Sequence, residues 1–122
     1  MHTTEFDAKW TLEEAVAFIR SLLPAVLKCG FYLGLTGSTL IKGSSEHDVD
    51  LIVYPMRTNP EPDLNALQTV LNSHNMYRFV GTPQVHAAWR RAGSLDEKKI
   101  EVWVWVDKSS GIDKRVDIFF LS

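Results

Sequence analysis

Residues 48–54 read DVDLIVY, and this stretch decides the fold because it predicts a β-strand with two carboxylates at its start. Side chains along a strand point alternately to the two faces of its sheet. Asp48 and Asp50 are therefore expected on one face and the intervening aliphatic residues on the other. The aliphatic face predicts packing against a core, and the acidic face predicts a polar site.

A turn of glycine and serine precedes this strand. Nine residues separate Ser38 from Asp48, and the short apolar run FYLGL at 31–35 predicts a strand before Gly37. The segment between is expected to be a loop, with one helical turn across Ser38–Lys42. Glycine allows a sharp turn and close backbone approach, and successive amides with a serine hydroxyl can bind phosphate oxygens. Alternatively, Ser38 caps the helical turn, which is compatible with phosphate binding.

Two amphipathic helices flank these elements. Thr11 and Glu14 form a capping-box pattern, and apolar residues at helical spacing follow as far as residue 27. Pro24 is expected to kink or split this first helix, and Gly30 to end it. A second helix is expected from residue 64 to about 73, capped by Asp63.

The C-terminal part predicts a β-hairpin. Residues 98–107 and 115–121 are rich in β-forming residues, and a turn-like segment at 108–111 joins them. Trp103 and Trp105 share one face of this hairpin and are expected in the core. Residues 77–80 are expected to be extended. Residues 85–91 fit a strand or a helix, with strand preferred.

The order of elements predicts an α+β fold, with a mixed β-sheet and helices packed on one face. The 122 residues are expected to form one domain, 1–122, because domains have roughly 150 residues in general.

A formal charge of −2 argues against strong stand-alone nucleic-acid binding. No apolar run approaches the roughly 18 residues of a membrane span. Without a charged and apolar leader, the expected compartment is the cytoplasm.

Carboxylates carry the candidate chemistry. Asp48 and Asp50 repel each other on one face, and a divalent cation would remove that conflict. Oxygen ligands favour Mg²⁺, with Mn²⁺ as an alternative. Asp117 is the preferred third carboxylate because it lies among apolar residues, so it must be at an edge or bound to something positive. Glu101 and Asp107 compete with it, but their alternating strand predicts that both face solvent.

Together, Leu35-Thr36-Gly37-Ser38, Asp48-Val49-Asp50-Leu51 and the strand-borne Asp117 resemble the nucleotidyltransferase superfamily of DNA polymerase β, specifically its small stand-alone members, the minimal nucleotidyltransferases. The resemblance covers residues 11–71, and residues 100–121 more loosely. It implies a palm-like core. It also implies that Gly37 and Ser38 hold the triphosphate, that Asp48 and Asp50 ligate two Mg²⁺ ions, and that Asp117 helps to activate the attacking hydroxyl.

The sequence departs from this family pattern at two positions. Thr39 stands where many minimal members have an arginine, so Lys42 is the nearest cation that could reach a phosphate. His47 stands where a serine is frequent. Both changes bear on substrate choice more than on the metal site.

The resemblance implies transfer of a nucleoside monophosphate from a nucleoside triphosphate to an acceptor hydroxyl. The sequence leaves the nucleotide, the acceptor and the role of residues 77–99 open. One alternative is a nucleotide-binding module without turnover. Another is the nucleotidyltransferase half of a two-protein complex of the toxin–antitoxin kind. The expected protein partner is a second copy of the chain or a helical protein, and no membrane association is expected.

Overall fold

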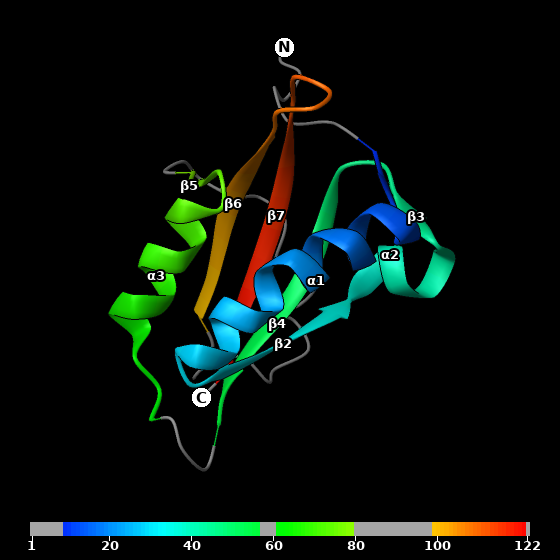
Figure 1. Ribbon diagram of the computed structural model, residues 1–122. Coiled ribbons are helices and arrows are strands. Elements are labelled where there is room, and N and C mark those ends of the chain that lie inside the picture. The colour runs from blue at the N-terminus through cyan, green and yellow to red at the C-terminus, as the bar shows by residue number, and fades with distance from the viewer. Residues whose placement is uncertain (1–8, 57–60, 80–98, 122) are drawn as a thin grey trace.

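A computed structural model describes residues 9–56, 61–79 and 99–121 (Figure 1). The segment at 85–91 lies outside these ranges. The elements in chain order are β1 (Trp10–Thr11), α1 (Leu12–Lys28), β2 (Phe31–Thr36), α2 (Gly37–Lys42), β3 (Ser44–Ser45), β4 (Asp48–Pro55), α3 (Leu64–Ser73), β5 (Met76–Arg78), β6 (Lys99–Asp107) and β7 (Ile112–Phe120).

Five of the strands form one mixed sheet in the order β2-β4-β7-β6-β5. β4 and β7 run parallel, and the other neighbouring pairs are antiparallel. The short strands β1 and β3 form a separate pair. Helices α1 and α3 lie on the same side of the large sheet (Figure 1). The predicted α+β fold, with a mixed sheet and helices on one face, is therefore confirmed.

Both expected ends of α1 are present. The Thr11 hydroxyl accepts a hydrogen bond from the Glu14 amide at 3.1 Å, and the Glu14 carboxylate accepts one from the Thr11 amide at 3.0 Å. Gly30 follows the last turn with a φ of 87°, a conformation that ends helices and favours glycine. The capping box and the glycine stop are both confirmed.

Pro24 does not split α1, which excludes one of the two effects expected of it. The helix continues from Leu12 to Lys28 with Pro24 inside it. A helical proline deprives the carbonyl four residues earlier of its donor. Here Pro24 and Arg20 are both exposed, so water can bond the carbonyl that loses its partner. Burial of Leu22 and Val26 holds the helix against the sheet on either side of the proline.

The core lies between the two longer helices and the sheet. Its aromatic centre joins Trp10, Phe18 and Trp105, with ring centroids 5.0–5.6 Å apart. Trp103 is buried beside them, which confirms the core prediction for both hairpin tryptophans. The aliphatic face of β4 joins the same core. None of the helices in the described part of the chain is long and apolar enough to cross a membrane.

The prediction that Glu101 faces solvent is wrong. Glu101 shares a strand face with Trp103, and that face packs against the core. Its carboxylate accepts a hydrogen bond from Trp103 Nε1 at 2.9 Å and lies 3.6 Å from the guanidinium of Arg78. Asp107 ends β6 and accepts hydrogen bonds from the hydroxyls of the predicted turn. Neither carboxylate therefore belongs to the acidic face of β4.

Candidate metal centre

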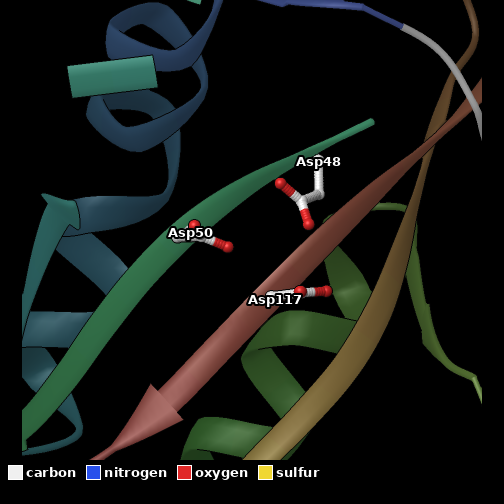
Figure 2. Close-up of side chains that lie close together, drawn as sticks. All are labelled: Asp48, Asp50 and Asp117. Atoms are coloured by element: carbon white, nitrogen blue, oxygen red, sulfur yellow. The ribbon is translucent and has the colours of Figure 1, made fainter. Parts of the chain in front are cut away.

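Three aspartates meet on one face of two central strands, opposite the face that packs against the core. β4 and β7 are parallel neighbours, and their register sets Asp50 opposite Asp117. Asp48 lies two residues before Asp50 on the same face. One carboxylate oxygen from each of the three lies within 4.8 Å of the others (Figure 2). We call Asp48, Asp50 and Asp117 the aspartate cluster. The structure thus brings together the three carboxylates that the sequence suggested.

Gly37 lies directly against this cluster. β2 pairs with β4 so that Thr36 is opposite Asp50, and Gly37 is the next residue. Its φ is 78°, which disfavours residues with a side chain. A Cβ at this position would overlap Oδ2 of Asp50. Both the backbone conformation and the close approach of Asp50 therefore favour glycine here.

Helix α2 carries the other predicted binding residues. Its N-cap is Thr36, so the alternative in which Ser38 caps the helix is wrong. Ser38 lies exposed within the first turn. The predicted helical turn is confirmed. Lys42 lies in the last turn with an exposed side chain, at the opposite end of α2 from Gly37. Thr39 is only 1% exposed and faces inward. Of the three residues predicted to bind nucleotide, Gly37 lies against the aspartate cluster, whereas Ser38 and Lys42 are exposed on α2.

Ser45 orients Asp48, a contact that the sequence reasoning missed. The Ser45 hydroxyl donates to Oδ1 of Asp48 at 3.3 Å and accepts from the Asp48 amide at 3.4 Å. A serine three residues before an aspartate is a common local hydrogen-bonding pattern. That spacing could have indicated this role.

Arg115 is the second missed residue. Its Nε donates to Oδ1 of Asp117 at 2.7 Å, and Nη2 donates to Oδ2 at 3.3 Å. The sequence predicts Asp117 either at an exposed edge or next to a positive group. It is 1% exposed and paired with Arg115, so the structure shows the positive group. Alternation along β7 places residues 115 and 117 on one face, and this was the available signal.

Burial and mutual repulsion change the acidity of the cluster. Burial, with the charges of Asp48 and Asp117, raises the pKa of Asp50 to about 7. Burial also raises the pKa of Asp117, although the Arg115 hydrogen bond and charge oppose this. The metal-free cluster therefore binds protons near neutral pH. Once these carboxylates are ionised they repel one another, and a bound cation relieves that repulsion.

The donor set fits a hard divalent cation. All three candidate ligands are carboxylate oxygens, which Mg²⁺ and Mn²⁺ prefer over soft ligands. The oxygens converge from two neighbouring strands, and in the described part of the chain the ion pair with Arg115 offsets one of three negative charges. Asp48, Asp50 and Asp117 would hold the cation. Lewis-acid activation of a hydroxyl and neutralisation of phosphates are the chemistry that such an ion supplies.

The sequence matches no protein-family model and shows no significant similarity to any curated protein.

We expect the metal-free protein to lose stability as the pH rises from 5 to 8. The folded-state pKa values of Asp50 and Asp117 lie above the usual value of 3.8, so the native state binds more protons than the unfolded state in this range. Each group contributes up to about 1.4 kcal/mol per pH unit, and the melting temperature should fall by about 5 °C or more. Thermal unfolding with a chelator present measures this.

The pKa of Glu14 shifts in the opposite direction, because its hydrogen bond from Lys114 lowers it from 4.5, so this group changes stability mainly around and below pH 4.5. Mg²⁺ competes with protons for the same oxygens. It should therefore stabilise the protein more at pH 8 than at pH 5.5. A melting temperature independent of pH would contradict the assignment of protons to the cluster.

Proposed function

We propose that the protein is a magnesium-dependent nucleotidyltransferase. It transfers a nucleoside monophosphate from a nucleoside triphosphate to an acceptor hydroxyl. The observation that carries this proposal is the meeting of three carboxylates from two parallel strands, directly against a glycine turn that leads into a short helix. This arrangement fits the resemblance of the sequence to the polymerase β superfamily, and the cytoplasm remains the proposed compartment.

In the reaction, the acceptor oxygen forms a bond with the α-phosphorus. The bond between the α-phosphorus and the bridging oxygen to the β-phosphate breaks, and pyrophosphate leaves. The proton of the hydroxyl departs to Asp117 or to water. Asp48 and Asp50, together with Asp117, would hold the cations, and Gly37 with the first amides of α2 would lie beside the phosphates. The protein contributes mainly positioning and charge, as is usual in phosphoryl transfer.

A panel of ribo- and deoxyribonucleoside triphosphates, labelled at the α-phosphate, tests this proposal. The purified chain is incubated with each triphosphate, with Mg²⁺ or Mn²⁺, and with RNA ends, small polyols or proteins as acceptors. We expect pyrophosphate release and stable transfer of the label with at least one combination. Release should cease with a chelator, because the phosphates and the cluster would repel each other without a cation.

The outcomes separate the proposal from its alternatives. A nucleotide-dependent rise in melting temperature without pyrophosphate release would overturn the enzyme and favour a nucleotide-binding module. Turnover that appears only after addition of a co-purified partner protein would favour a two-chain complex. Absence of nucleotide binding and of turnover, both with and without a co-purified partner, would reject all of these functions.

A further inference from the structure

We propose that Arg115 is a phosphate-binding residue that Asp117 holds in the cation-free protein, and that a divalent cation in the aspartate cluster releases it. This inference rests on the proposed function of the cluster. Arg115 then has two opposite effects. It weakens binding of the cation alone, and it strengthens binding of a polyphosphate together with the cation.

The geometry of the pair carries this inference. Arg115 and Asp117 are two residues apart on β7, on the same face, and the guanidinium contacts both carboxylate oxygens at 2.7 and 3.3 Å. The Arg115 side chain is 17% exposed and that of Asp117 is 1% exposed. The register also sets Arg115 opposite Asp48. The guanidinium therefore lies at the margin of the cluster, with its donors on one of the candidate ligands.

A cation in the cluster and the Arg115 guanidinium compete for the negative charge of the Asp117 carboxylate. In the described residues, the charge of Arg115 acts on both Asp50 and Asp117. A divalent cation in the cluster would take up an oxygen of Asp117 and repel the nearby guanidinium. Binding of a cation should therefore loosen the Arg115–Asp117 pair, and the pair should weaken cation binding.

A released guanidinium is suited to a phosphate. Its planar fork of N–H donors matches phosphate oxygens and keeps its charge at any physiological pH. The long side chain of Arg115 starts beside the cluster and already reaches solvent. For this role, a polyphosphate bound through a cation at the cluster must extend from Gly37 across β4 to β7, where Arg115 lies. Arg115 would then exchange one anionic partner for another.

Two measurements on the variant Arg115→Gln test the two opposite effects. Isothermal titration gives the affinity for Mn²⁺ alone, and a second titration gives the affinity for the Mn²⁺ complex of tripolyphosphate, which has no base to recognise. We expect Arg115→Gln to bind Mn²⁺ about fivefold more tightly and the tripolyphosphate complex about tenfold more weakly. Lys108→Gln, which removes a charge from the exposed β6–β7 turn, should change neither affinity.

Arg115→Lys covers the case in which Arg115→Gln does not fold. It keeps the charge but loses the fork, so its Mn²⁺ affinity should stay near that of the wild type while tripolyphosphate binding weakens. Unchanged Mn²⁺ affinity in a folded Arg115→Gln variant overturns the competition. Unchanged tripolyphosphate affinity in either variant overturns the phosphate role. Absence of Mn²⁺ binding in both wild type and Arg115→Gln rejects the proposed metal function itself, and the inference with it.

Discussion

Asp50→Asn is expected to reduce the proposed nucleotide transfer by about 10³-fold or more, while the protein remains folded. Asp50 is central in the cluster, because it lies opposite Asp117 across the strand pair and against Gly37. Asparagine keeps the shape but removes the charge that balances a cation. Pyrophosphate release from the active triphosphate measures the loss, and titration with Mn²⁺ measures the weaker binding.

The same substitution should stabilise the metal-free protein at pH 8. Burial raises the pKa of Asp50 to about 7, so its ionised form is unfavourable in the fold at that pH. Removing it should add about 1–2 kcal/mol to the free energy of unfolding, and less at pH 5. Glu46→Gln, at an exposed residue two positions before Asp48, serves as control and should keep full activity. Substantial transfer by the Asp50→Asn protein would refute the assigned site.

Gly37→Ala is expected to damage both the fold and the cluster. The positive φ of Gly37 costs an alanine about 1–2 kcal/mol. The added Cβ would also overlap Oδ2 of Asp50, and it would lie 3.0 Å from Cβ and Cγ of that residue. The carboxylate must therefore move, and we expect Mn²⁺ affinity to fall about 10- to 100-fold. Chemical denaturation and Mn²⁺ titration measure the two effects separately.

Gly43→Ala is the matched control. Gly43 has a φ of 84°, similar to that of Gly37, but among the described residues beyond its chain neighbours no atom lies within 4 Å of the position of its Cβ. Its replacement should cost similar stability and leave Mn²⁺ affinity unchanged. If the two variants bind Mn²⁺ equally well, the contact between Gly37 and Asp50 has no role in the cluster.

Local patterns in the sequence determined most of the secondary structure. The capping box at Thr11 and Glu14 and the stop at Gly30 depend on residues within a few positions of one another. The alternation at 48–54 likewise determined that Asp48 and Asp50 share a face. These features could be predicted because their geometry follows from the backbone period alone.

Pairing between distant strands could not be read from the same patterns. Periodicity tells which residues share a face, but not what covers that face. Glu101 lies on the core-packed face of β6 beside Trp103, although its charge suggested solvent. Pro24 is tolerated because its side of α1 is exposed. Both outcomes depend on packing with segments far away in the chain.

The candidate site divides in the same way. The sequence by itself determined the acidic face of β4 and the glycine turn before it, because both lie within one local segment. Only the tertiary structure decided that β7 runs parallel beside β4, with Asp117 opposite Asp50 and Arg115 as its partner. The physical reason is that strand order and register arise from burial of the whole sheet, to which residues separated by more than sixty positions contribute jointly.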